Sequence, residues 1–153
     1  MIIIILTAAL MLTGIVAGMY ACTVIHDYRI NELSAAEYMA MHQMRDKTFR
    51  VVMPPLRLVN LALVAAASFV IPAGLPKALA ISSAVLIVID IVLTTKLQVP
   101  LNREIQSWTA STIPAHWAEI RDRWAARHNI RVLLDLVSFL CVVAASVLAI
   151  AHF

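Results

Sequence analysis

The chain has 153 residues and a formal net charge of +3, and 62% of its residues are apolar whereas only 14% are charged. Its mean hydropathy is +0.88. Soluble domains average roughly 45–50% apolar and about 25% charged residues, so this chain has too little polar surface to cover a soluble fold. The composition excludes a soluble globular enzyme, a disordered tail and a conventional nucleic-acid-binding protein. It indicates a small membrane protein with little room for an extramembrane domain.

Four apolar stretches predict helices that cross the membrane, because a span needs about 20 residues. The first stretch has no charged side chain and lacks the basic start of a signal peptide, so we expect it to be retained. Pro72, Gly74 and Pro76 predict a tight turn between the second and third stretches. We therefore expect an all-α fold, a four-helix transmembrane bundle with up-down-up-down connectivity in one domain, residues 1–153. The predicted spans are about 2–25, 56–72, 78–96 and 131–152.

The distribution of lysine and arginine predicts the orientation in the membrane. Eleven of the twelve basic residues lie in or beside the two long connections, and Lys77 stands alone on the opposite side. Cytoplasmic segments carry an excess of Lys and Arg. We therefore expect the chain to lie in the cell membrane, which is the inner membrane where there are two. Both long connections should lie in the cytoplasm and both termini on the outer side. The lipid bilayer is then a partner, and no nucleic acid is expected.

Both long connections are predicted to be largely helical. Ser34 and Glu37 form a capping-box pattern, in which each side chain satisfies a free amide at the helix start. The consecutive Pro54 and Pro55 are expected to end this first helix. In the second connection, Pro114 suits the first turn of a helix that runs into the fourth span. The helices should thus extend beyond the membrane on the cytoplasmic side. The predicted helical connections are residues 34–53 and 102–130.

Polar side chains inside a membrane are costly, and they are usually paired or functional. Asn60, Asp90 and Asp135 all fall in the cytoplasmic third of the predicted spans. Asp90 can simply pair with a neighbouring cation. Asp135 can pair with Arg131, four residues earlier, and so fix the depth of the helix at the membrane interface. These structural interpretations stay open beside a functional one.

Two predicted helices present a polar and aromatic face near this depth. The spacing from Trp124 through His128 to Arg131 places the three side chains on one side of the last helix. His42 and Arg45 share a face of the first connecting helix. We expect the two faces to enclose a polar pocket at the cytoplasmic mouth of the bundle. The candidate binding residues are Tyr38, His42, Arg45, Asn60, Asp90, Trp108, Trp124 and Asp135.

Two motifs resemble those of a known family. One is Val99-Pro100-Leu101-Asn102, directly after the third span, and the other is Arg123-Trp124 followed by His128 and Arg131. With four spans, a helical first connection and Pro-Pro before the second span, the chain resembles the anthrone-oxygenase-like membrane proteins. The resemblance covers essentially the whole chain.

The resemblance implies a membrane-embedded oxidoreductase, a monooxygenase that oxidises anthrones to anthraquinones with O2 and without flavin or nicotinamide. The substrate would be a hydrophobic aromatic or enolisable small molecule. By matching positions, His128 is the candidate catalytic base, because histidine exchanges protons near neutral pH. Asn102 and Arg131 are candidates for holding the oxyanion. Trp108 and Trp124 would stack on a flat substrate.

Two other classes of function stay open. His42 and His128 could be axial ligands of a haem or ligands of a metal ion, although the sequence requires no cofactor. In a non-catalytic small-molecule-binding or accessory subunit, Asp90 and Asp135 would only neutralise nearby arginines. A homo-oligomer is compatible with each of these three functions.

Overall fold

The computed structural model describes residues 2–151, and all regular secondary structure in that range is helical. Four helices are long and apolar enough to cross a membrane, so the expected all-α fold is confirmed and the chain is an integral membrane protein. The last predicted span reached residue 152, which lies outside the described residues. The elements are α1 (Ile2–His26), η1 (Ile30–Glu32), α2 (Ala35–Val70), α3 (Leu75–Leu93), the π-helical η2 (Thr94–Gln98), α4 (Val99–Gln106) and α5 (Trp117–Ile150).

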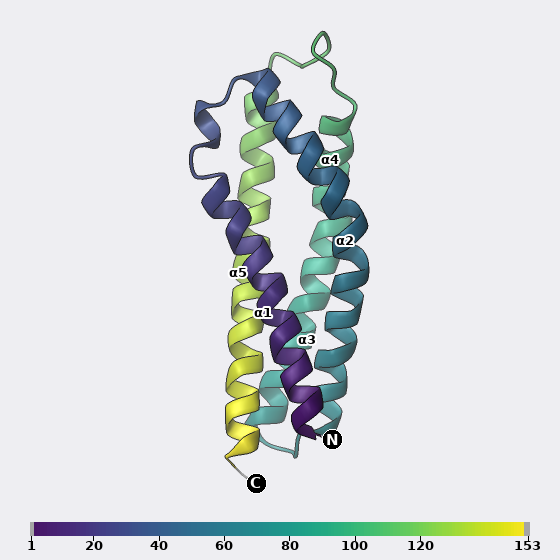
Figure 1. Cartoon of the computed structure of the whole chain (residues 1–153), viewed down its shortest axis with the longest axis vertical. Coiled ribbons are helices and arrows are strands. Elements are labelled where there is room, and N and C mark those ends of the chain that lie inside the picture. The colour runs from purple at the N-terminus through teal and green to yellow at the C-terminus, as the bar shows by residue number, and fades with distance from the viewer. Residues whose placement is uncertain (1, 152–153) are drawn as a thin grey trace.

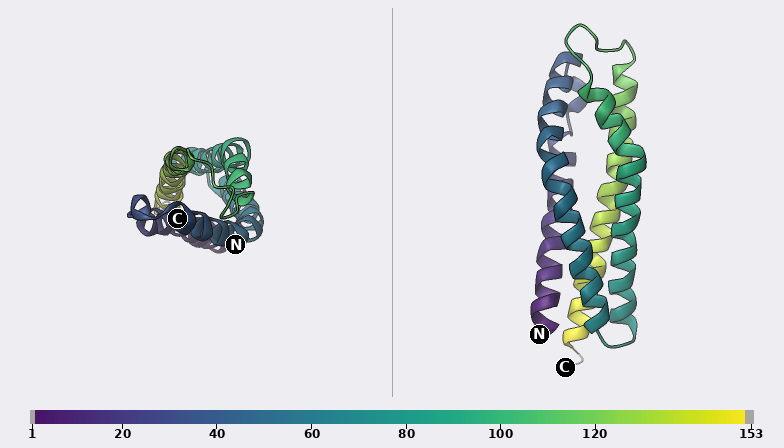
Figure 2. Two further views of the ribbon diagram at one scale, coloured as in Figure 1. Left: turned by 90° about the horizontal axis from the view of Figure 1, so that it is seen from above. Right: turned by 90° about the vertical axis from the view of Figure 1, so that its right-hand side faces the viewer.

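The four long helices surround a common axis. Both α1 and α3 pack against α2 and α5, and α3 continues through η2 into α4 as one rod, Leu75–Gln106. The start of α1, the end of α5 and the short α2–α3 turn lie at one end of the bundle (Figure 1). The other end holds η1, α4 and the loop before α5. Seen from above, the helices mark the corners of an open quadrilateral (Figure 2).

α2 begins where the sequence predicts but continues through the predicted break. Ser34 Oγ accepts a hydrogen bond from the Glu37 N–H, and the Glu37 carboxylate accepts one from the Ser34 N–H at 2.8 Å, which confirms the capping box. The expectation that Pro54 and Pro55 end the helix is wrong, because both lie inside α2. Each proline removes one backbone donor, but a helix in a packed membrane bundle tolerates this loss where neighbouring groups satisfy the freed carbonyls.

The two remaining connections differ in how well the sequence predicts them. The tight turn before α3 is confirmed, and Gly74 adopts a φ of +130° there, a conformation open to glycine. The helical start at Pro114 is wrong, because α5 begins at Trp117 and residues 107–116 form an irregular loop. The Pro114 carbonyl accepts a hydrogen bond from the Trp117 N–H at 3.1 Å, so the proline lies in a turn that precedes the helix.

The helices are longer than one membrane crossing requires. α2 has 36 residues and α5 has 34, which corresponds to about 50 Å each at a rise of about 1.5 Å per residue. The hydrocarbon core of a bilayer is only about 30 Å thick. α2 and α5 are therefore long enough to extend beyond the hydrocarbon core of the membrane.

The half of the bundle next to the α2–α3 turn has an apolar core made of small and branched side chains. Small residues let helices in a membrane approach closely. Ser83 of α3 and Ser138 of α5 form a hydrogen bond at 2.8 Å within this half. The buried core residues include Ala9, Val64, Ala67, Ala80, Ile87, Val142, Ala145 and Ala149, each 3% exposed or less.

Candidate functional site

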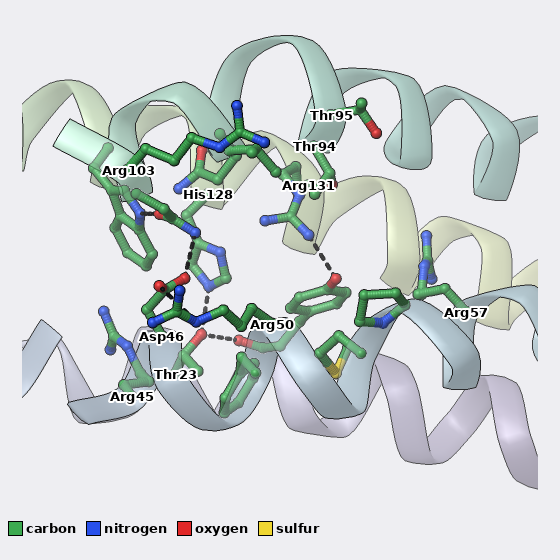
Figure 3. Close-up of a pocket in the computed structure, with 18 of the residues that line it drawn as sticks. Thr23, Arg45, Asp46, Arg50, Arg57, Thr94, Thr95, Arg103, His128 and Arg131 are labelled. Atoms are coloured by element: carbon green, nitrogen blue, oxygen red, sulfur yellow. Dashed lines mark hydrogen bonds and ion pairs between the residues drawn. The ribbon is translucent and has the colours of Figure 1, made fainter. Parts of the chain in front are cut away.

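A cavity of about 840 Å³ lies between the helices in the half of the bundle that holds the long connections. Its walls come from α1, α2, α5 and the continuous rod of α3, η2 and α4. Figure 3 shows side chains from these elements converging on it. Cavities of roughly 300–1,000 Å³ are typical of small-molecule sites, so this one has room for a polycyclic ligand.

A buried ion cluster lies beside the cavity. Arg57 donates hydrogen bonds to Asp90 and Asp135, both at 2.5 Å, and Arg131 Nε donates to the other oxygen of Asp90 at 2.9 Å. All four side chains are 6% exposed or less, and their charges balance, which avoids the cost of an unpaired buried charge. The pairing of Asp90 with a cation is thus confirmed, whereas Asp135 pairs with Arg57 rather than with Arg131.

Tyr20 of α1 holds this cluster against the cavity wall. Its hydroxyl oxygen accepts a hydrogen bond from Arg131 Nη2 at 2.5 Å. The Arg131 guanidinium also lies 4.7 Å from the centre of the tyrosine ring, and that of Arg57 lies 5.7 Å from it. Because cations are attracted to aromatic faces, one side chain of the first helix helps to position both arginines.

The Trp124 indole is the centre of an aromatic group on the cavity wall. The His128 ring stacks on it, with ring centres 4.8 Å apart and an interplanar angle of 20°. The His42 ring meets it nearly at right angles, at 5.1 Å. Arg45 lies 4.8 Å from the indole centre and donates two hydrogen bonds to Asp27, at 2.6 and 2.8 Å. The predicted faces of α2 and α5 therefore meet.

Asn102 fixes the orientation of Trp124. Its side-chain carbonyl accepts a hydrogen bond from Trp124 Nε1 at 2.7 Å, and its amide donates to Asp46 Oδ1 at 2.8 Å. These two hydrogen bonds join α5, α4 and α2 across the cavity wall. One amide hydrogen of Asn102 remains after the bond to Asp46, so the residue can both position the indole and donate to a ligand.

The hydrogen bonds of Thr23 assign the tautomer of His128. Thr23 Oγ1 donates its only hydrogen to the Tyr20 carbonyl at 2.7 Å, and it is also hydrogen-bonded to His128 Nε2. The threonine oxygen must then accept from His128, which places the imidazole hydrogen on Nε2. Among the described residues, His128 Nδ1 has no hydrogen-bond partner. The imidazole therefore keeps an unpaired basic nitrogen on a side chain that lines the cavity.

Several other buried polar atoms of residues that line the cavity have no hydrogen-bond partner within residues 2–151. They are both ring nitrogens of His42, both amide atoms of Gln98, Thr94 Oγ1, Arg45 Nη2 and Arg57 Nε. Leaving a buried donor or acceptor unsatisfied costs about 1–3 kcal/mol. A wall that carries several such atoms fits a ligand with hydrogen-bonding groups of its own.

The family follows from the comparison with known proteins. Residues 41–141, well over half of the chain, match the family model described as anthrone oxygenase. The chain belongs to the anthrone oxygenase family. No curated protein and no solved structure gave a significant match. The matched residues include His42, Asn102 and His128, whereas α1, which supplies Tyr20 and Thr23, precedes them.

The structure brings most of the predicted site residues of this anthrone oxygenase family member to one place. Three lie just outside the cavity wall: Tyr38 packs on His42 with ring centres 5.6 Å apart, Asp135 belongs to the ion cluster, and Asn60 accepts a hydrogen bond from Thr13 at 2.8 Å. Trp108 does not line the cavity but is buried in an apolar cluster that also contains Tyr38 and Trp124. The predicted residues on the cavity wall are His42, Arg45, Asp90, Asn102, Trp124, His128 and Arg131.

Sequence reasoning missed several residues of the site, among them Tyr20, Thr23, Asp46, Thr94 and Gln98. A spacing signal existed for Gln98, because Asp90, Thr94, Gln98 and Asn102 follow one another at intervals of four. No comparable signal marks Thr23, which lies in an apolar helix and acts through a contact 105 positions away in the chain.

A metal site of the common kind is not evident in residues 2–151, since no three His, Cys, Asp or Glu side chains there are grouped to hold an ion. The two histidines that the sequence suggests as ligands, His42 and His128, both pack on Trp124. Both have unpartnered ring nitrogens, which is the donor chemistry that a haem or metal would need.

Proposed function

We propose that this protein is a membrane-embedded monooxygenase that uses O2 to oxidise a hydrophobic aromatic or enolisable substrate, with an anthrone as the model. Its membership of the anthrone oxygenase family supports the reaction class. The observation that carries the proposal is the state of His128, a residue of the cavity wall whose Nε2 is held by Thr23 while its Nδ1 has no hydrogen-bond partner within residues 2–151. An oriented, neutral imidazole is what proton removal from a bound substrate requires.

The reaction balances without a further reductant. An anthrone has a CH2 group between two aromatic rings, and loss of one of its protons gives a delocalised enolate. His128 Nδ1 takes that proton, and the enolate transfers electrons to O2. One oxygen atom then becomes the new quinone carbonyl, and the other leaves as water with the two hydrogens of the CH2 group.

Two groups on the cavity wall are suited to stabilise the enolate oxygen. Arg131 donates from Nε to Asp90 and from Nη2 to Tyr20, and its Nη1 donates no hydrogen bond within residues 2–151. Asn102 keeps one amide hydrogen beyond that given to Asp46. Donors held in place before the reaction stabilise developing negative charge without reorganisation, so both residues fit the role of oxyanion donors.

The orientation that we propose places the cavity on the cytoplasmic side. The long connections contain or adjoin eleven of the twelve Lys and Arg residues, and basic segments stay in the cytoplasm. A hydrophobic substrate would then enter from the inner leaflet, while the termini lie outside.

Oxygen uptake by the purified protein in lipid nanodiscs tests the function, with anthrone as substrate and quinone absorbance as a second readout. A reaction without protein corrects for spontaneous oxidation. We expect His128→Ala to lower the catalysed rate by about 100- to 10,000-fold, the usual contribution of a general base. The matched control is His116→Ala, because His116 is exposed in the loop before α5 and should leave the rate unchanged.

Full activity of a correctly inserted His128→Ala protein would contradict the assignment of the base. Absence of catalysed uptake in the wild-type protein, with anthrone shown to bind, would contradict the oxygenase itself.

A second candidate function is favoured by the unpartnered nitrogens of His42 and His128, which could ligate a haem or metal ion. A visible absorption spectrum and metal analysis of the purified protein test it. A stoichiometric haem or metal that is lost in both His42→Ala and His128→Ala would establish this function, and its absence from the wild-type protein would reject it.

A further inference from the structure

We propose that Gln98 and Thr94 form a hydroxyl-binding subsite in the cavity, which selects phenolic aromatic ligands over the same ring system without a hydroxyl group. The inference rests on the proposed function for the identity of the ring system. It adds two residues that recognise the ligand, on a different element from the candidate base.

The two side chains occupy the widened turn of the rod. η2 is a π-helical turn, closed by a hydrogen bond from the Val99 N–H to the Thr94 carbonyl. π-Turns inside longer helices occur frequently at functional sites. Thr94 and Gln98 both line the cavity, on the face of the rod that also carries Asp90 and Asn102. Figure 3 shows Thr94 on this rod, beside the cavity.

Neither side chain is satisfied by the protein. Gln98 is 1% exposed, yet within residues 2–151 neither its amide nitrogen nor its amide oxygen has a hydrogen-bond partner, and Thr94 Oγ1 has none there either. The neighbouring Thr95 shows the ordinary alternative, because its hydroxyl donates to the Ile91 carbonyl at 2.7 Å. Thr94 does not make the equivalent bond, so its hydroxyl remains available to a ligand.

The chemistry of these atoms indicates a hydroxyl group as their partner. Gln98 Oε1 can only accept, whereas Gln98 Nε2 and the Thr94 hydroxyl can donate. A phenolic hydroxyl donates to the first and accepts from either of the others. An ionised carboxylate would leave Gln98 Oε1 without a donor. An unsubstituted aromatic ring would leave all three atoms unpaired, at a cost in affinity.

Equilibrium binding of two stable probes tests the subsite: anthraquinone and 2-hydroxyanthraquinone, measured by quenching of tryptophan fluorescence in nanodiscs. We expect the wild-type protein to bind the hydroxylated probe about tenfold more tightly, as a matched pair of hydrogen bonds would give. In Gln98→Leu this preference should fall to about twofold or less, while the Kd for anthraquinone stays within a factor of about three.

Gln106→Leu is the matched control. Gln106 lines the same cavity, but its amide donates to the Gln43 carbonyl at 3.1 Å and its amide oxygen accepts from Arg50 at 3.3 Å. Its loss should therefore leave the tenfold preference intact. Thr94→Val provides a second variant, which should reduce the preference if Gln98→Leu fails to fold.

If wild type, Gln98→Leu and Thr94→Val all show the same preference for the hydroxylated probe, the subsite is overturned. A wild-type protein that binds the two probes equally, or that binds neither, would also overturn it. Because quinones are not oxidised further, the result does not depend on turnover. A preference that is lost in Gln98→Leu, together with no oxygen uptake from anthrone, would leave the subsite standing and reject the oxygenase. If the wild-type protein oxidises anthrone but shows no preference for the hydroxylated probe, the oxygenase is supported and the subsite is rejected.

Discussion

The two halves of the bundle are built on different principles. Next to the α2–α3 turn, alanines and branched residues pack all four helices closely, and the buried serines Ser83 and Ser138 satisfy each other. Toward the long connections the helices diverge (Figure 1), and the cavity lies between them. There, buried polar atoms of His42, Gln98 and His128 have no hydrogen-bond partners in the part of the chain that the structure describes.

This difference separates stability from binding. Close packing contributes dispersion contacts that hold the helices together in lipid, where there is no hydrophobic drive between them. Unsatisfied polar atoms do the opposite and lower stability. Their concentration around one cavity is therefore expected of a site that a ligand completes. Substitutions in one half should mainly affect stability, and those in the other mainly affect ligands.

The largest effect is expected at the boundary of the two halves. Arg57→Met leaves Asp90 and Asp135 with only Arg131 to balance them, so we expect a loss of about 3–5 kcal/mol in stability. Thermal unfolding in detergent, followed by circular dichroism, measures the loss. In the double variant Arg57→Met/Asp135→Leu, Asp90 keeps Arg131 and the charges balance, so most of the stability should return. A double variant as unstable as the single one would show that the cluster is not held by charge balance.

A smaller effect, on chemistry alone, is expected at Thr23. Thr23→Val removes the acceptor that holds the hydrogen of His128 on Nε2, and we expect the oxidation rate to fall about tenfold, as for the loss of one oriented hydrogen bond. Thr23→Ser keeps the acceptor and should restore the rate. 15N NMR of labelled histidine should show the Nε2–H form in wild type and a mixture of tautomers in Thr23→Val. The same tautomer and rate in all three proteins would reject the positioning role.

The smallest effect is expected in the apolar half. Ser138→Ala removes the hydrogen bond to Ser83 between α3 and α5, and buried polar contacts in membrane bundles are worth about 0.6 kcal/mol on average. A double-mutant cycle with Ser83→Ala measures the coupling from unfolding in detergent. Neither variant should change the binding of anthraquinone. A change in ligand affinity as large as that from a cavity variant would contradict the separation of the two halves.

The sequence is most informative about features that repeat or that have strict local chemistry. Apolar length predicts the four membrane-spanning helices, and Ser34 with Glu37 predicts the start of α2. The spacing of Trp124, His128 and Arg131 predicts a shared face that the structure brings to the cavity. These predictions hold because helix geometry alone determines them.

The failures come where tertiary contacts decide. Pro54 and Pro55 normally break a helix, but α2 continues through them because packing in the bundle outweighs the local preference. The link between Thr23 and His128 joins α1 to α5 and leaves no pattern in either segment. The resemblance implied that Trp108 stacks on a substrate in the cavity, whereas it is buried with Ile105 and Ile120 in an apolar cluster.

The most direct test of the central claim is a structure of the protein with bound anthraquinone, determined by cryo-electron microscopy in nanodiscs. We expect density for the flat ring system in the cavity, in contact with Trp124 and His128, and with Gln98 at its edge when 2-hydroxyanthraquinone is used instead. Density only at the lipid-facing surface, or in the groove between α1 and α2 around Cys22, would contradict the assignment of the cavity as the functional site.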